Sequence, residues 1–359
     1  STGTKHQKEA GIIARRELLS AIGRTDSQLP LNPIRFDEAC MRYLFWLKGR
    51  IGLDATENKY NQQREVIISS LRPFFRDCHL HSIRTKDIEE YQSQRIVMGR
   101  MGDIYKNKKV SKSTLAKDNS IIRGIFNFCK REDLILEIPM IPNVNDDTQR
   151  ATFKEEYAEI FREKLDEWIV PNINDADHVK DYRKLFRTYC MCIYYGGFRP
   201  GKEMLLMWRQ VEYGETTDQD GNTYPIVIFN DVQTSKRKIG KEETRTVIAL
   251  GLLKPYLEDL KKLDFYNPDG YIFPHPPSTQ LVDKKFIGQP IKSFKKQFGS
   301  FCNKYKLLYD EEGKRRAMYS LRHAYAELRL INGEVSPFHL SINMGSRADV
   351  ILKWYQKAS

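Results

Sequence analysis

The sequence predicts a multidomain protein, with an all-α N-terminal domain followed by a mixed α+β domain. Three observations lead to this fold class. The 359 residues, 40% of them apolar, supply enough material for two hydrophobic cores. Apolar residues repeat at helical spacing from residue 36 to residue 136, whereas β-branched segments typical of strands begin only at residue 224. Residues 137–150 contain two prolines and no periodicity, which is typical of an exposed linker.

These patterns give four segments. Residues 1–30 are polar and mixed in charge, and we expect a leader or arm there. The α-helical domain is expected at 31–137, the linker at 138–151 and the α+β domain at 152–359.

The charge balance narrows the classes of partner. The chain has 59 Lys and Arg against 47 Asp and Glu, a net charge of +12, and this excess suits a polyanion. We expect no membrane association and a cytoplasmic location, because no apolar run reaches the ~18 residues of a bilayer span and residues 1–6 lack a signal peptide's apolar core. The six cysteines form no C-x-x-C pair, so we predict reduced thiols and no metal site.

The N-terminal domain shows helical stripes throughout. One stripe runs from Phe36 to Leu47 and a second from Val66 to Phe74. The clearest helix begins at Ser113 as N-cap and places an apolar face between Leu115 and Cys129. Its other face carries Lys117 and Arg123, which are candidate DNA contacts or, equally, a solvated basic face.

The second domain is expected to open with a capping box, Thr152 to Glu155. A buried helix follows at 184–195. Two strands, 224–229 and 244–250, flank the charged turn 235–242, and they predict a small antiparallel sheet with a basic hairpin tip.

The most concentrated positive segment is residues 284–306, which holds seven lysines and no acid. Pro290 is expected at the first position of a helix there, with an apolar stripe from Ile291 to Tyr305. One-sided charge on an amphipathic helix favours contact with phosphates over plain solvation. Candidate DNA contacts are Lys292, Lys295 and Lys296.

Three helices are expected near the C-terminus. Ser320 is a candidate N-cap that would put Arg322 and His323 in a first helical turn, where backbone N–H groups favour an anion; residues 332–333 would end that helix. A second helix begins at residues 336–337 and ends at Gly345. Ser346 would cap a last helix.

Five pieces of the chain together resemble the ordered signature of the tyrosine recombinases, the family of phage and mobile-element integrases. They are Gly197-Phe198-Arg199-Pro200-Gly201, the lysine-bearing hairpin, Tyr319-Ser320-Leu321-Arg322-His323, Asn343-Met344-Gly345-Ser346 and Tyr355. Tyr355 follows Arg322 by 33 residues. The resemblance implies a core-binding domain in the first half and a catalytic domain in the second.

The resemblance also implies a chemistry. Tyr355 matches the nucleophile that forms a 3′-phosphotyrosyl link to DNA. A phenol of pKa ~10 needs nearby cations or a base to lose its proton. Arg199 and Arg322 match the arginines that clamp the phosphate. A hairpin lysine matches the general acid: Lys236 is preferred, and Lys238 and Lys241 stay open.

The chain departs from the family's commonest pattern at three positions. Tyr319 replaces a histidine, and Ser346 replaces a histidine or tryptophan, so proton transfer would depend on His323, water or another group. Lys202 stands where an acid is usual, with Glu203 one residue later, so either the acid has shifted or the turn differs. Glu203 is therefore the candidate supporting residue.

The leading interpretation is a site-specific recombinase, with integration or excision of a mobile element as its role. The resemblance implies duplex DNA at attachment sites as partner, a homo-tetramer on DNA, a monomer or weak oligomer when free, and no metal, ATP or other cofactor. Two alternatives stay open. One is a catalytically silent DNA-binding accessory protein, and the other is a nicking enzyme like the type IB topoisomerases.

Overall fold

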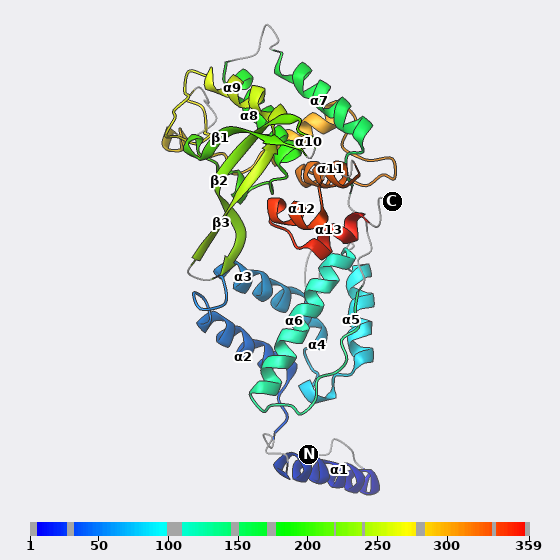
Figure 1. The fold of residues 1–359 in the computed structure, drawn as a ribbon. Coiled ribbons are helices and arrows are strands. Elements are labelled where there is room, and N and C mark those ends of the chain that lie inside the picture. Colours follow the sequence, from blue (N-terminus) through cyan, green and yellow to red (C-terminus); the bar gives the residue numbers. More distant parts are fainter. Residues whose placement is uncertain are drawn as a thin grey trace. The chain divides into compact units, whose positions relative to one another are not determined.

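The computed structural model describes residues 6–26, 32–98, 110–144, 151–170, 177–218, 220–238, 241–277, 284–331 and 335–355 (Figure 1). The chain divides into two compact units, residues 1–148 and 149–359. The predicted segment boundaries stay predictions. One expectation about the linker is wrong, however: Ile141 is buried and the carbonyl of Pro142 accepts a hydrogen bond from Asn119, so this part packs on the first unit.

Among its described residues, the first unit has helices as its regular elements and no strand beyond isolated bridges, which confirms the all-α prediction. Its elements are α1 (Gln7–Asp26), α2 (Phe36–Gly49), α3 (Glu57–Val66), a π-helical turn η1 (Ile67–Leu71), α4 (Arg72–Phe75), η2 (Leu80–Ser82), α5 (Thr85–Met98) and α6 (Lys112–Arg131). Helix α1 lies within residues 1–30, the segment predicted as a leader or arm.

Helix α6 begins two residues earlier than predicted. Its N-cap is Ser111, whose hydroxyl accepts from the N–H of Thr114 at 3.3 Å, so Ser113 is not the cap. Its predicted apolar face is buried from Leu115 to Cys129, and Lys117 and Arg123 are exposed.

The second unit combines helices with one sheet. Its elements are α7 (Glu155–Ile169), α8 (Asp177–Gly196), η3 (Lys202–Met204), η4 (Trp208–Gln210), β1 (Val211–Thr217), β2 (Thr223–Lys238), β3 (Lys241–Leu250), η5 (Gly251–Leu253), α9 (Lys254–Lys261), η6 (Lys284–Phe286), α10 (Lys295–Lys304), α11 (Met318–Ile331), α12 (Pro337–Met344) and α13 (Ala348–Tyr355). The strands are antiparallel in the order β1-β2-β3. The predicted antiparallel sheet is confirmed, but its predicted turn at 235–242 is wrong in extent, because β2 continues to Lys238 and β3 begins at Lys241. Strand β1 was missed because its side chains are largely exposed and polar.

Helix α8 provides the centre of this unit. It packs against α7, α9, α11 and β3, and its residues from Leu185 to Ile193 are buried (Figure 1). The predicted aromatic stripe of α10 joins this core through Phe294, Phe298 and Phe301. The helix itself begins only at Lys295; Pro290 pairs instead with Pro274 in an isolated antiparallel bridge, so its predicted N1 position is wrong.

Three predicted caps are also wrong. The Thr152 hydroxyl donates to Glu327 rather than capping α7, which begins at Glu155. Helix α11 begins at Met318, so Ser320 lies inside it and Arg322 in its second turn, away from the N-terminal N–H groups. Helix α13 begins at Ala348, after Arg347, so Ser346 is not its cap.

Helix α12 agrees with its prediction at both ends. The Ser336 hydroxyl accepts from the N–H of His339, Pro337 is the first helical residue, and Gly345 ends the helix in the left-handed conformation. The predicted stop of α11 at 332–333 lies outside the described residues.

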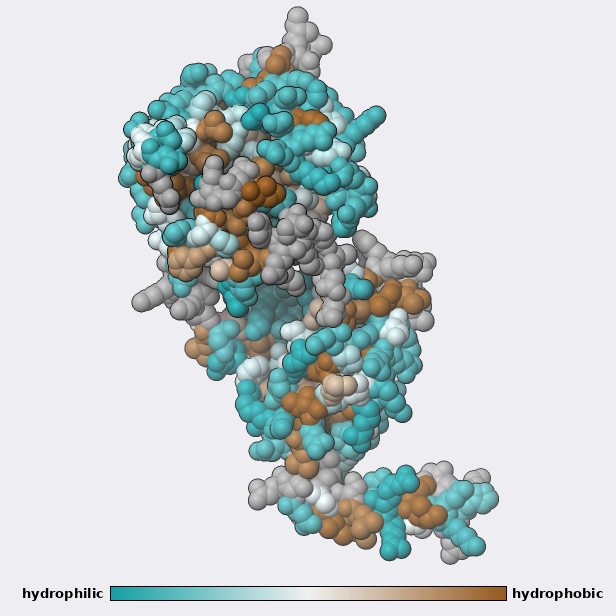
Figure 2. Space-filling model, turned by 45° about the vertical axis from the view of Figure 1, so that its right-hand side comes forward, coloured by the Kyte–Doolittle hydropathy of each residue, from teal (hydrophilic) through white to brown (hydrophobic). Residues whose placement is uncertain are grey.

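Within the described part of the chain, no helix combines the length and the apolar character that crossing a bilayer requires. Figure 2 shows hydrophilic residues over much of the visible face, interrupted by apolar patches.

Candidate functional site around Glu203

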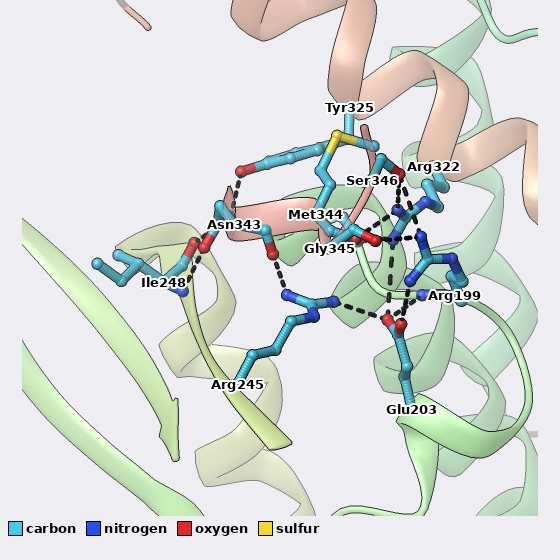
Figure 3. A network of polar contacts seen from close by, with 11 residues as sticks. Arg199, Glu203, Arg245, Ile248, Arg322, Tyr325, Asn343, Met344, Gly345 and Ser346 are labelled. Atoms are coloured by element: carbon cyan, nitrogen blue, oxygen red, sulfur yellow. Dashed lines mark hydrogen bonds and ion pairs between the residues drawn. The ribbon is translucent and has the colours of Figure 1, made fainter. Parts of the chain in front are cut away.

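Three arginines from separate segments meet one buried glutamate in the second unit. Arg199 follows α8, Arg245 lies on β3 and Arg322 lies on α11, while Glu203 lies in η3 (Figure 3). We call these four residues the arginine cluster. Their convergence depends on the tertiary fold, since Arg245 is 42 residues from Glu203 in the sequence.

The carboxylate of Glu203 is the hub of the cluster. Its side chain has 0% exposure, and its Oε1 lies 2.6 Å from Nη1 of Arg199. Its Oε2 lies 2.7 Å from Nη2 of Arg245 and accepts from the backbone N–H of Arg199 at 2.8 Å. Nη1 of Arg322 lies 3.7 Å from the same oxygen. The acid has therefore shifted by one position: Glu203, not Lys202, pairs with Arg199.

The cluster carries more positive than negative charge. Three guanidinium groups surround one carboxylate, which leaves a local charge of about +2 because arginine stays protonated near neutral pH. Burial and, next, the charge of Arg199 lower the pKa of Arg322 to about 10. Burial also lowers the pKa of Arg245. Both shifts have the direction expected for cations whose burial outweighs their pairing with Glu203.

The C-terminus of α12 supplies further acceptors. Three consecutive carbonyls each accept from a different arginine: Asn343 from Arg245, Met344 from Arg322 at 2.6 Å, and Gly345 from Arg199 at 2.5 Å. The last carbonyls of a helix lack intrahelical partners and carry its negative dipole end. They therefore hold the guanidinium groups in place without cancelling their charge.

Ser346 sits directly between two of the arginines. Its Oγ accepts from Nη2 of Arg322 at 2.8 Å and from Nη2 of Arg199 at 3.2 Å. Because both contacts use the oxygen as acceptor, the hydroxyl proton points elsewhere and is available to a ligand.

Two glycines make this packing possible. Gly345 has φ +58°, and a Cβ there would lie 2.8 Å from Nε of Arg245. Gly197 has φ +66°, and a Cβ there would lie 2.5 Å from the Tyr325 ring. The carbonyl of Gly197 accepts from Nη1 of Arg322. A side chain at Gly345 would displace Arg245, and one at Gly197 would displace Tyr325.

Tyr319 and His323 lie beside the cluster. Their rings meet edge to face with centroids 5.0 Å apart, and the Arg322 guanidinium carbon is 5.9 Å from the Tyr319 ring centroid. Both side chains line a small pocket together with Arg322 and Ser346. The structure thus brings five of the seven residues named as catalytic together.

The structure describes only the backbone of the other two residues named as catalytic. Lys236 lies on β2 and Tyr355 is the last residue of α13, but the positions of both side chains fall outside what the structure describes. The same holds for Lys238 and Lys241, so the choice of hairpin lysine stays open.

An open cavity adjoins the cluster. Its walls come from β2, β3 and α12, and it is lined by Thr234, Glu243, Thr244, Arg245, Ser341, Ile342, Gly345 and Ser346. Arg245 and Ser346 therefore border solvent-accessible space of about 380 Å³. A phosphate group with its two flanking ester oxygens fits such a space.

The predicted DNA contacts are all on the surface. Lys292, Lys295 and Lys296 are exposed in the second unit, as are the other four lysines of residues 284–306. Lys117 and Arg123 are exposed in the first unit.

Arg245 is the member of the cluster that sequence reasoning missed. A signal was present: Arg245 alternates with Val247 and Ala249, which are buried on the inner face of β3, while Thr244, Thr246 and Ile248 are exposed. An arginine in the inward register of a strand needs an acceptor inside the protein. That register alone would have marked it.

Comparisons by sequence and by structure give different outcomes. No family model matches the chain, and no curated protein matches its sequence. Solved structures do match. A lambda integrase dimer bound to a COC′ core site has a TM-score of 0.58 at 15% identity, over 98% of this chain and 82% of that one.

Two further structures are similar to this chain. The Tn1549 transposon integrase in complex with transposon right end DNA has a TM-score of 0.58 at 15% identity, over 88% of this chain and 94% of that one. The XerH site-specific recombinase bound to palindromic difH substrate has a TM-score of 0.52 at 14% identity, over 82% and 72%. The chain therefore has the fold of these integrases and recombinases, which confirms the predicted fold class.

Proposed function

We propose that this protein is a site-specific DNA recombinase that cleaves and rejoins duplex DNA through a 3′-phosphotyrosyl intermediate. One observation carries the proposal: three arginines around one buried carboxylate leave a surplus of positive charge beside an open cavity. The fold adds support, because solved structures that share it are integrases and a recombinase bound to DNA.

The charge of the cluster suits phosphoryl transfer. A phosphodiester carries one negative charge, and attack by a phenolate gives a pentacoordinate transition state with two. A local charge of about +2 from three guanidinium groups and one carboxylate matches the transition state better than the ground state. Arg199 and Arg322 are the groups assigned to the non-bridging oxygens, with Glu203 holding Arg199.

The proposed reaction balances without a cofactor. The phenolic oxygen of Tyr355 bonds to phosphorus and passes its proton to His323 or to water, while the bond from phosphorus to the 5′-oxygen breaks. The 5′-oxygen takes a proton from a hairpin lysine, Lys236 being our first choice, and leaves as a hydroxyl. Ser346 donates its hydroxyl to a non-bridging oxygen, and Tyr319 and His323 relay protons. Because the phosphotyrosine conserves the ester, the reverse attack rejoins DNA without metal or ATP.

The assembly belongs to the same proposal. We assign the DNA backbone to Lys292, Lys295 and Lys296 in the second unit and to Lys117 and Arg123 in the first, all of them exposed. Four copies would act together on two attachment sites, in the integration or excision of a mobile element. The cytoplasmic location predicted from the sequence belongs to this proposal too.

The test uses a nicked suicide duplex in EDTA. Target fragments are first selected by footprinting the protein on DNA that flanks its gene, and the adduct is then resolved on a denaturing gel. Wild type is expected to form a covalent adduct that Tyr355→Phe abolishes. Tyr309→Phe, an exposed tyrosine of the same unit, is the matched control and keeps full activity.

Each contrary result selects an alternative. Footprints without any adduct indicate the silent accessory protein. Plasmid relaxation without a specific site and without recombinant products indicates the topoisomerase-like enzyme. An adduct that survives Tyr355→Phe refutes the assigned nucleophile.

A further inference from the structure

Arg245 is the arginine of the cluster that comes from the hairpin, since Arg199 follows α8 and Arg322 lies on α11. It comes from β3, one arm of the hairpin that carries the candidate lysines, and it reaches both the hub carboxylate and the C-terminus of α12 (Figure 3). Its Nη2 donates to Glu203 at 2.7 Å and its Nη1 donates to the carbonyl of Asn343. One planar guanidinium group thus fixes the distance between these two parts of the site.

A purely mechanical role does not account for this arrangement, because another residue already ties β3 to α12. The amide side chain of Asn343 accepts from the N–H of Ile248 at 2.8 Å and donates to the Ile248 carbonyl at 3.0 Å. It also donates to the hydroxyl of Tyr325 at 2.9 Å. Joining β3 to α12 at Ile248 therefore does not require the buried cation of Arg245, three residues earlier.

The charge balance also argues against a structural pair. Glu203 already has a close guanidinium partner in Arg199, at 2.6 Å. A second close cation on the same buried carboxylate adds charge that the protein does not neutralise, and a buried uncompensated charge lowers stability. Such an arrangement is expected where the missing anion is a ligand.

The surroundings of Arg245 place its charge where that ligand would bind. It lines the open cavity together with Gly345 and Ser346, and its Nε is buried with no hydrogen-bond partner among the described residues. Gly345 is the residue that lets it come this close, since a Cβ there would lie 2.8 Å from that Nε.

We propose that Arg245 is a further positioning residue of the phosphate site. It orients Glu203, and through it Arg199, against the turn that carries Ser346, and it supplies the third positive charge facing the scissile phosphate. The inference rests on the proposed recombinase function and adds to it a residue from the hairpin strand. It couples the strand that bears the general acid to the groups that hold the phosphate.

The test compares Arg245→Met with Arg187→Met. Arg187 is a matched control because its side chain is 10% exposed against 11% for Arg245, it also pairs with carboxylates, Asp166 and Asp259, and it too has a buried Nε without a partner. Cleavage is measured in single turnover on two suicide duplexes, one with the normal phosphodiester and one with an uncharged methylphosphonate at the scissile position. Melting temperatures of both variants are recorded in parallel.

Arg245→Met is expected to slow cleavage of the phosphodiester by about 100-fold, the size of effect seen when one group stabilising a developing anion is removed. On the methylphosphonate the loss should shrink to within about tenfold, because the transition state then carries one negative charge instead of two. Arg187→Met should keep the same small ratio to wild type on both duplexes. DNA affinity should change little in either variant.

Several results would overturn the inference. An equal loss on both duplexes means that Arg245 is structural, and undiminished cleavage means that it is dispensable. If Arg245→Met does not fold, Arg245→Lys replaces it: a lysine keeps the charge without the fork, so a rate equal to wild type on both duplexes would contradict the positioning role. A wild type that forms no adduct refutes the proposed function first, and the inference with it.

Discussion

Buried arginines in the two units have opposite charge surroundings. In the first unit, Nε of Arg95 lies 3.0 Å from Asp118, whose carboxylate also accepts from the hydroxyl of Tyr91 at 2.8 Å. Side-chain exposure is 5% for Arg95 and 0% for Asp118, so a buried cation pairs directly with a buried anion. In the second unit, three guanidinium groups surround the single carboxylate of Glu203.

The difference separates a structural ion pair from a ligand site. Burial raises the pKa of Tyr91, followed by the charge of Asp118, so the phenol stays neutral and the Asp118 network holds α5 to α6. The cluster around Glu203 has a carboxylate that is just as buried, but it has two fewer negative than positive charges. Carbonyls from α12 orient its guanidinium groups without neutralising them. The number of carboxylates per guanidinium group, more than burial or contact distance, distinguishes arginines that bind a ligand from arginines in a structural ion pair.

Removing one arginine from each unit gives the largest contrast. Arg322→Met should lower the cleavage rate by about 1,000-fold, since a donor to the developing charge is lost, while thermal stability changes little. Arg95→Met should leave Asp118 buried without its partner and lower the free energy of unfolding by about 3–5 kcal/mol. Suicide-substrate cleavage and urea denaturation measure the two effects. Equal destabilisation by both variants would contradict the distinction.

The next contrast removes the carboxylates. Glu203→Gln leaves three guanidinium groups without an anion and should lower the free energy of unfolding by about 3 kcal/mol. Inorganic phosphate should restore much of that loss by occupying the cluster. Asp118→Asn should lose a similar amount, but added phosphate should not restore it, because the buried Arg95 side chain, 5% exposed, is closed to an ion from solvent. Melting curves in chloride and in phosphate at equal ionic strength distinguish the two cases.

A glycine pair tests the close packing of the cluster. Gly345→Ala combines a left-handed φ of +58° with a Cβ 2.8 Å from Nε of Arg245, whereas Gly313 has φ +73° and nothing within 4 Å of its Cβ. The φ cost is about 1–2 kcal/mol in both. Only Gly345→Ala should also reduce cleavage, because it displaces Arg245. If Gly313→Ala impairs cleavage equally, the effect is not local to the cluster.

The sequence predicted those parts of the site that depend on near neighbours. Ser336, Pro337 and Gly345 set the ends of α12 through local capping, and all three were identified correctly. The start of α11 was missed because Met318 is buried in the core and extends the helix backwards past Ser320, a tertiary effect that overrides a local cap preference. The prediction also missed Arg245 as a member of the cluster, because its contact with Glu203 depends on the tertiary fold.

Contacts over long sequence separations could not be predicted from local pattern. Glu203 is four residues from Arg199, so their pairing was within reach. Arg245 and Glu203 meet only in the tertiary fold, where η3 packs against β2 and β2 pairs with β3. The family pattern pointed to Arg199 and Arg322 but contains nothing at position 245. The alternation of exposed and buried residues along β3 indicates that Arg245 faces inward, which the motif does not.

The smallest effect on the free energy of unfolding is expected at Glu327, a carboxyl group with no guanidinium among its described contacts. Burial raises the pKa of Glu327, opposed by the hydrogen bond from Thr152 at 3.0 Å. Because the pKa is higher in the folded state, ionisation disfavours folding: no penalty exists below the unfolded pKa of about 4.3, and it grows as pH rises to the folded value. Glu327→Gln should therefore stabilise the protein by about 1 kcal/mol at pH 7 and by nothing near pH 4.

Urea denaturation across that pH range measures the difference, with Glu312→Gln, an exposed glutamate, as control. A gain that is independent of pH would show that the amide improves packing instead, and that Glu327 carries no unbalanced charge.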